Sequence, residues 1–249
     1  MSPTRSRHDL VEGAKLGVRR ALGKADLSIG RDPYSHRVTR ALAHHGIDTV
    51  LDVGANVGQY AALLRAAGYR GHILSVEPLD SAFAALSARA AKDPRWTALQ
   101  NGVGEAPGTI DINISANSYS SSVLDINDAH LEAAPDSRYV GTQSIELTTV
   151  AQLVEQQGID PARCLLKVDT QGYESQVLTG AAPILGKIAA VQLELSFVEL
   201  YAGQALFDDH VTTLRGHGFE LWSLDPGISD TDGRLLQCDG LFMRPRGAA

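Results

Sequence analysis

The stretch Asp48-Thr-Val-Leu-Asp-Val-Gly-Ala-Asn-Val-Gly58 decides the fold. Its apolar positions predict a short buried strand, and residues 60–67 predict a helix that follows a glycine-rich turn. Nineteen positions after Gly58, Glu77 ends a second apolar run, residues 73–76. A strand, a glycine-rich turn, a helix and a second strand that ends in an acid are typical of nucleoside sites, where backbone N–H groups face an anion and the acid binds the ribose hydroxyls.

The spacing inside this turn separates two kinds of nucleoside ligand. A dinucleotide site needs Gly-x-Gly-x-x-Gly, because bare backbone must approach a pyrophosphate, whereas residues 52–58 read Asp-x-Gly-x-Asn-x-Gly. An acid at the end of the first strand suits an ammonium group, and a turn with fewer glycines suits a small carboxylate. S-adenosylmethionine carries both groups and a ribose, so it is the predicted cofactor. A nicotinamide or flavin nucleotide is the main alternative, and a turn that binds nothing is the third.

The composition is that of an ordinary globular protein, with 44% hydrophobic and 20% charged residues in a chain of 249. Cys164 and Cys238 lie in apolar runs without metal-binding spacing, which predicts buried thiols in a reducing compartment. The sequence contains neither a run of about 18 apolar residues nor the apolar core of a signal peptide. A cytoplasmic location is the expectation.

The net charge of −7 is unevenly distributed. Residues 1–24 contain six Lys or Arg and two acids, for +4, which leaves −11 for the rest of the chain. That acidic remainder predicts no nucleic-acid partner. Residues 1–47 are interpreted as a helical extension packed on the core, with peripheral membrane contact as the less favoured alternative, and residues 48–249 as one ligand-binding domain.

After the first turn, strand-like and helix-like segments alternate, which predicts an α/β fold with a mostly parallel sheet and helices on both faces. The last two strands, residues 219–222 and 241–243, are expected to form an antiparallel edge pair. Residues 109–114 alternate apolar and polar side chains, which predicts a further strand with one solvated face. The polar stretch 115–141 predicts a long loop over the ligand, with a disordered insertion as the alternative.

Four acids fall at or near the ends of predicted strands: Asp52, Glu77, Asp169 and Glu194. In open α/β sheets, ligands bind beyond the carboxyl ends of the strands, so these acids are expected to converge on one site. Each of them could also be an unrelated surface acid, but four matching positions favour a shared site.

The predicted cofactor site combines the first turn, Glu77 and the Asn-Gly-Val-Gly turn at residues 101–104. Asp52 and the first turn would hold the methionine part, and Glu77 would accept hydrogen bonds from both ribose hydroxyls. The turn 101–104 would face the adenine, although a tight connection alone also explains it. The candidate cofactor residues are Asp52, Gly54, Asn56, Gly58, Glu77, Asn101, Gly102 and Val103.

The candidate catalytic residues are Asp169, Lys167 and Glu194. Asp169 is the first candidate for a residue next to the transferred group, and Glu194 is the second. A lysine inside an apolar strand is costly unless its ammonium reaches a partner, so the tip of Lys167 is predicted at a carboxylate or a substrate oxygen, with a solubility charge on an edge strand as the alternative. Methyl transfer is an in-line displacement that needs alignment, and it needs a base when the acceptor is a hydroxyl. His130 is the alternative base.

A divalent metal is considered but not predicted as a further cofactor. Two acids at adjacent strand ends could hold a cation that lowers the pKa of the acceptor. The sequence supplies too few suitably spaced ligands for such a site.

These motifs together resemble the FkbM-type family of class I S-adenosylmethionine-dependent methyltransferases. The resemblance covers residues 48–244, and Lys-Val-Asp-x-x-Gly-Tyr-Glu is its most specific part. The segments that carry it are Val50-Leu-Asp-Val-Gly-Ala-Asn-Val-Gly-Gln-Tyr60, Val76-Glu-Pro78, Asn101-Gly-Val-Gly104, Ser120-Ser-Ser122, Leu166-Lys-Val-Asp-Thr-Gln-Gly-Tyr-Glu174, Leu193-Glu-Leu-Ser-Phe197 and Leu200-Tyr201.

The resemblance implies a Rossmann-like seven-stranded sheet and O-methylation of a hydroxyl on a sugar, glycolipid or secondary metabolite. It makes Glu174 an active-site candidate beside Lys167 and Asp169, whereas Gln171 stands where the family often has an acid. The expected partner is a small-molecule, glycan or glycolipid acceptor, and self-association is left open. A nucleotide-dependent oxidoreductase and a non-catalytic nucleoside-binding module are the alternative functions.

Overall fold

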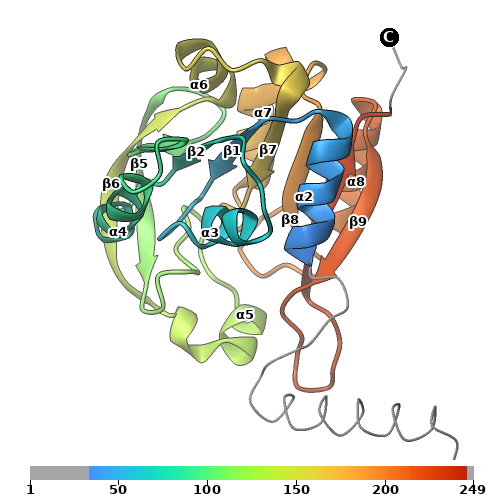
Figure 1. Cartoon of the computed structure of the whole chain (residues 1–249). Coiled ribbons are helices and arrows are strands. Elements are labelled where there is room, and N and C mark those ends of the chain that lie inside the picture. The colour runs from blue at the N-terminus through green and yellow to red at the C-terminus, as the bar shows by residue number, and fades with distance from the viewer. Residues whose placement is uncertain (1–33, 246–249) are drawn as a thin grey trace, which may run out of the picture.

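The computed structural model describes residues 34–245 of the chain. These residues contain a seven-stranded sheet (Figure 1). In spatial order its strands are β3 (Trp96–Leu99), β2 (His72–Val76), β1 (Thr49–Val53), β7 (Cys164–Val168), β8 (Ala190–Ser196), β10 (Gln237–Met243) and β9 (Glu220–Pro226). The pairs from β3 to β8 are parallel, and β10 is antiparallel to both of its neighbours. The predicted α/β class and the antiparallel pair at the edge are confirmed.

Helices cover both faces of this sheet (Figure 1). One face carries α2 (Tyr34–His45), α3 (Gln59–Ala66) and α4 (Asp80–Ala90), and the other carries α6 (Val150–Gln156), α7 (Glu174–Leu185) and α8 (Phe207–Gly216). Successive strand residues point to opposite faces. Val50 therefore packs in the cluster with α2, α3 and α4, and Leu51 in the cluster with α6, α7 and α8.

A second, three-stranded sheet has the order β4 (Gly102–Val103), β6 (Tyr139–Thr148) and β5 (Gly108–Ser115). The strand predicted at residues 109–114 is thus confirmed within β5. The turn predicted at residues 101–104 is wrong, because β4 pairs with the end of β6. Glycine allows this close pairing, since a Cβ on Gly102 would lie 2.6 Å from Leu147 Cδ2.

The polar stretch 115–141 is a structured segment, so the alternative of a disordered insertion is wrong. It contains the short helix α5 (Asp128–Ala133), the 3₁₀ turn η1 (Pro135–Ser137) and the start of β6. A second 3₁₀ turn, η2 (Pro161–Arg163), precedes β7. Hydrogen bonds from the stretch reach distant residues, such as the Ser122 hydroxyl to the Gln171 carbonyl at 2.6 Å.

Residues 34–47 of the proposed N-terminal extension lie within the described part of the chain. Within it, α2 packs against the sheet, with Val38 and Leu42 buried in one cluster with Leu241 and Met243. The predicted basic helix of residues 1–24 lies outside the described residues. No helix within residues 34–245 combines the length and the hydropathy needed to cross a bilayer.

Candidate active site

A cavity of about 310 Å³ opens at the carboxyl ends of the parallel strands. It lies at the switch point of the sheet, where β1 is flanked by β2 on one side and β7 on the other. The three-stranded sheet, residues 118–121 and Val123 complete its wall. Of the predicted site residues, those that line it are Gly54, Asn56, Glu77, Asn101, Gly102, Val103, Asp169 and Glu194.

The glycine turn after β1 is shaped by three residues with positive φ: Gly54 (73°), Asn56 (47°) and Gly58 (83°). A Cβ on Gly54 would lie 1.8 Å from the backbone oxygen of Asp169, so glycine lets the end of β1 approach the end of β7. Gly58 lies outside the cavity wall and is required for another reason. A Cβ there would lie 2.8 Å from the indole ring of Trp96.

Glu77 is held at the end of β2 by backbone donors. Its Oε2 accepts a hydrogen bond from the Asn56 N–H at 2.8 Å, and its Oε1 accepts one from the Leu79 N–H at 3.0 Å. Burial raises the pKa of this carboxyl to about 7, although both N–H donors lower it. The buried carboxylate still has lone pairs toward the cavity, and these can accept hydrogen bonds from a diol.

The wall near β4 is mainly apolar. Asn101, Gly102 and Val103 line it together with side chains from the three-stranded sheet and from Leu79, the residue before α4. The apolar members are Leu79, Val103, Ile112, Ile145 and Leu147, and Tyr173 adds an aromatic ring. A flat, weakly polar group such as a nucleobase fits a surface of this kind.

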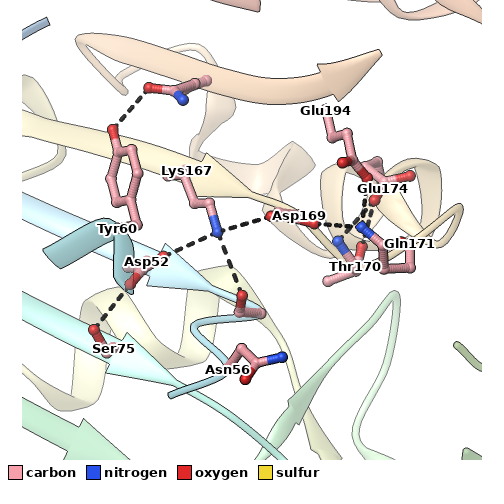
Figure 2. A network of polar contacts seen from close by, with 12 residues as sticks. Asp52, Asn56, Tyr60, Ser75, Lys167, Asp169, Thr170, Gln171, Glu174 and Glu194 are labelled. Atoms are coloured by element: carbon pink, nitrogen blue, oxygen red, sulfur yellow. Dashed lines mark hydrogen bonds and ion pairs between the residues drawn. The ribbon is translucent and has the colours of Figure 1, made fainter. Parts of the chain in front are cut away.

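Lys167 points its ammonium group between two carboxylates (Figure 2). Nζ lies 3.2 Å from Asp52 Oδ1 and 3.4 Å from Asp169 Oδ2, and it donates to the Gly54 carbonyl at 3.3 Å. Burial lowers the pKa of Lys167, but the two carboxylates outweigh it and raise the pKa above its ordinary value. The two carboxylates thus favour the ammonium form of Lys167, and an ammonium group has no lone pair with which to act as a base.

Asp52 lies behind the cavity wall rather than in it. Its side chain is fully buried, and its Oδ2 accepts a hydrogen bond from the Ser75 hydroxyl at 3.0 Å while its Oδ1 pairs with Lys167. The sequence prediction placed this carboxylate on the methionine part of the cofactor. In the structure it forms an ion pair with Lys167, and the Lys167 ammonium group lies between it and Asp169 (Figure 2).

Asp169 and Glu194 are joined by the side chain of Gln171 (Figure 2). Gln171 Nε2 donates to Asp169 Oδ1 at 2.8 Å and to Glu194 Oε2 at 2.7 Å. Burial raises the pKa of Glu194 well above its ordinary value, and the neighbouring carboxylates of Asp169 and Glu174 raise it further. The strand ends of β7 and β8 thus present two carboxylates to one cavity.

Two other candidates lie outside the cavity wall. Glu174 turns its carboxylate back to the chain, where Oε1 accepts hydrogen bonds from the Thr170 N–H at 2.7 Å and the Gly172 N–H at 3.3 Å. His130 is buried against Tyr201, with the ring centroids 5.0 Å apart, and neither ring nitrogen has a hydrogen-bond partner among the described residues. Glu174 therefore shapes the turn after β7, and His130 does not face the ligand space.

Sequence reasoning missed Asp239, which lies opposite Glu194 in the pairing of β10 with β8. Burial raises the pKa of Asp239 to about 6, and the Asp169 carboxylate raises it as well. Its place beside Glu194 depends on the register in which β10 pairs with β8, and no local sequence pattern indicates that register. Within residues 34–245, no group of three or more His, Cys, Asp or Glu side chains is arranged to hold a metal ion.

A family model described as the methyltransferase FkbM domain matches residues 52–221. No curated protein matches the sequence. Solved structures with a similar fold include an rRNA methylase from Streptococcus thermophilus, at 11% identity and a TM-score of 0.47, which covers 88% of this chain and 100% of that one.

A second similar structure is magnesium protoporphyrin IX methyltransferase from Synechocystis PCC 6803 with bound SAM, at 10% identity and a TM-score of 0.46, with 98% and 87% of the two chains covered. A third is 1,6-didemethyltoxoflavin-N1-methyltransferase from Burkholderia thailandensis, at 13% identity and a TM-score of 0.43, with 98% and 92% covered. Likeness at this level assigns no acceptor.

Proposed function

The chain belongs to the methyltransferase FkbM domain family, and from that premise we propose that this S-adenosylmethionine-dependent methyltransferase methylates a hydroxyl group of a sugar, glycolipid or secondary metabolite. The observation that carries the proposal is the continuity of one cavity. Glu77 lies in its wall at the end of β2, and Asp169 and Glu194 lie in the same wall at the ends of β7 and β8. In the proposal, the nucleoside binds at Glu77 and the acceptor hydroxyl binds at Asp169 and Glu194, within the same cavity.

The residues at the β1 and β2 ends suit the cofactor. Glu77 offers two carboxylate oxygens to the ribose diol, Gly54 and Asn56 bring backbone close to the methionine part, and the apolar wall around Val103 suits the adenine. The bound cofactor supplies a methyl carbon made electrophilic by a sulfonium sulfur.

Glu194 is the proposed acceptor of the hydroxyl proton. Its Oε2 is held by Gln171, and its Oε1 receives no hydrogen bond from residues 34–245, so that oxygen is available to a substrate hydroxyl. Burial and the neighbouring carboxylates raise the pKa of Glu194, which makes its ionised form more basic than an ordinary carboxylate.

Asp169 has a positioning role in the proposal, although the sequence had ranked it first as the base. Both of its carboxylate oxygens already have partners, since Oδ2 faces the Lys167 ammonium at 3.4 Å and Oδ1 accepts a hydrogen bond from Gln171 at 2.8 Å. Asp169 can accept a hydrogen bond from a second substrate hydroxyl and so orient the first one toward the methyl carbon.

The proposed setting is the cytoplasm, with a small-molecule, glycan or glycolipid acceptor. Both cysteines are free and buried, as the sequence predicted, which is compatible with a reducing compartment.

Calorimetric titration with S-adenosylhomocysteine, with NADH as the control ligand, tests the first part of the proposal. Binding of S-adenosylhomocysteine alone is expected. A panel of neutral glycosides, glycolipids and amines with a labelled methyl donor then tests the second part. Label on a hydroxyl oxygen supports O-methylation. Label on nitrogen alone would refute it, and tight NADH binding would refute the cofactor assignment.

A further inference from the structure

Gln171 occupies an unusual place in the turn after β7. Its backbone adopts a φ of 55°, a left-handed conformation that few residues other than glycine adopt. This conformation turns its side chain toward the ends of β7 and β8, where Nε2 contacts Asp169 and Glu194 (Figure 2). The two N–H bonds of the amide are both used, one for each carboxylate.

The orientation of the amide is set by Tyr201. The Tyr201 hydroxyl donates to Gln171 Oε1 at 2.7 Å, and a flipped amide would place that oxygen against two carboxylates instead. The backbone is anchored as well. The Gln171 carbonyl accepts a hydrogen bond from Ser122 at 2.6 Å, and a Cβ on Gly172 would lie 2.9 Å from Tyr201 Cβ, so the turn packs tightly on that ring.

Asp169 and Glu194 are both half-buried, and each carboxylate lies within hydrogen-bond distance of the same amide nitrogen. Two carboxylates so close together repel each other and are stabilised by a donor or a cation between them. A divalent cation with oxygen ligands is a common solution. Lys167 relieves part of the charge on Asp169, but it faces Oδ2, on the side away from Gln171. The space between Asp169 Oδ1 and Glu194 Oε2 is filled by the amide nitrogen.

We infer that Gln171 is a positioning residue whose amide nitrogen stands where a divalent cation would otherwise bridge Asp169 and Glu194. The amide holds the two carboxylates at a fixed separation and leaves their remaining lone pairs to the acceptor. This role rests on the proposed function in one respect, which is that Asp169 and Glu194 face the acceptor. The bridge itself is a property of the free protein.

Replacing the amide by a carboxylate tests the inference without an acceptor. In Gln171→Glu, three carboxylates meet at one point, and Mn²⁺ should bind to them in calorimetric titration. The affinity should exceed that of the unchanged protein by about tenfold or more, because metal affinity follows ligand charge and placement. Adding Glu194→Gln to this variant should remove the gain. Gln157→Glu, an exposed position at the end of α6, introduces the same charge elsewhere and should change nothing.

Two results would overturn the inference. The first is that the unchanged protein binds Mn²⁺ and that the substitution Glu194→Gln abolishes this binding. The cation would then displace the amide easily. The second is a Gln171→Glu protein that binds Mn²⁺ no better than Gln157→Glu. If Gln171→Glu does not fold, Gln171→Asp replaces it, because aspartate tolerates a left-handed φ better.

Titration of the same proteins with S-adenosylhomocysteine separates this inference from the proposed function. Unchanged affinity in Gln171→Glu is expected, since the amide contacts no residue of the β1 and β2 ends. Absence of binding in every protein would refute the cofactor assignment and leave the Mn²⁺ result standing.

Discussion

The end of the cavity at β1 and β2 and the end at β7 and β8 both present carboxylates, but different groups hold them. Glu77 is held by the backbone N–H groups of Asn56 and Leu79. Asp169 and Glu194 are held by the side chains of Lys167 and Gln171. Backbone donors persist when side chains change, whereas each side-chain contact depends on one residue identity. In the proposed function, the end held by backbone donors binds the cofactor, and the end held by side chains binds the acceptor.

The largest effect is expected where the two ends meet. Gly54→Ala places a side chain on a residue with positive φ and against the Asp169 backbone oxygen. The cost should be about 2–6 kcal/mol of unfolding free energy, from ~1–3 kcal/mol of backbone strain and ~1–3 kcal/mol of overpacking. Denaturant unfolding measures it. Gly46→Ala has a similar φ of 68° and open space around it, so it should show the strain alone. Equal losses in both variants would mean that the contact with Asp169 is unimportant.

The second effect concerns transfer. Glu194→Gln keeps the size of the side chain but removes the proposed proton acceptor, so the methyl-transfer rate should fall by roughly two to four orders of magnitude. Initial rates with a labelled methyl donor measure this, and S-adenosylhomocysteine affinity should stay unchanged. Asp169→Asn should lose less, because its carboxylate orients the acceptor. A larger loss of rate in Asp169→Asn than in Glu194→Gln would mean that Asp169 accepts the proton and Glu194 orients the acceptor.

The third effect is on cofactor affinity. Glu77→Gln removes the charge that receives the ribose hydroxyls, and binding of S-adenosylhomocysteine should weaken by about 1.5–3 kcal/mol, the range for a hydrogen bond to a charged group. Calorimetry gives the value. Glu155→Gln, an exposed change on α6, serves as the control. Full affinity in a folded Glu77→Gln protein would remove Glu77 from the cofactor site.

The smallest effect is the pH dependence of that affinity. Burial raises the pKa of Glu77 to about 7 in the free protein, and the ribose hydroxyls donate to the ionised form. Affinity should therefore be complete above this pKa and fall as the pH drops through it, by up to about tenfold for each unit below. Calorimetry across that range measures the slope, and Glu77→Gln should flatten it. An unaltered slope in the variant would assign the titration to another group.

The fold was largely predictable because its signals are local. Apolar runs predicted β1 and β2, and the alternation of strand-like and helix-like segments predicted the mostly parallel sheet to which β3, β7 and β8 also belong. The prediction at residues 101–104 failed because an Asn-Gly pair is typical of a turn, and only the pairing of Gly102 with Leu147 makes that segment a strand. The helix α5 was missed because six residues in a polar stretch carry too little periodicity.

The sequence by itself determined the turn between β1 and α3 and the acid that ends β2, since both depend on residues close together in the chain. Only the tertiary structure decided that Asp52 faces Lys167 rather than the cavity, that Gln171 lies between Asp169 and Glu194, and that Asp239 lies opposite Glu194. The physical reason is range. Backbone conformation and hydrophobic periodicity are set by near neighbours, whereas the partner of a buried charge is set by strand order and register, which bring distant residues together.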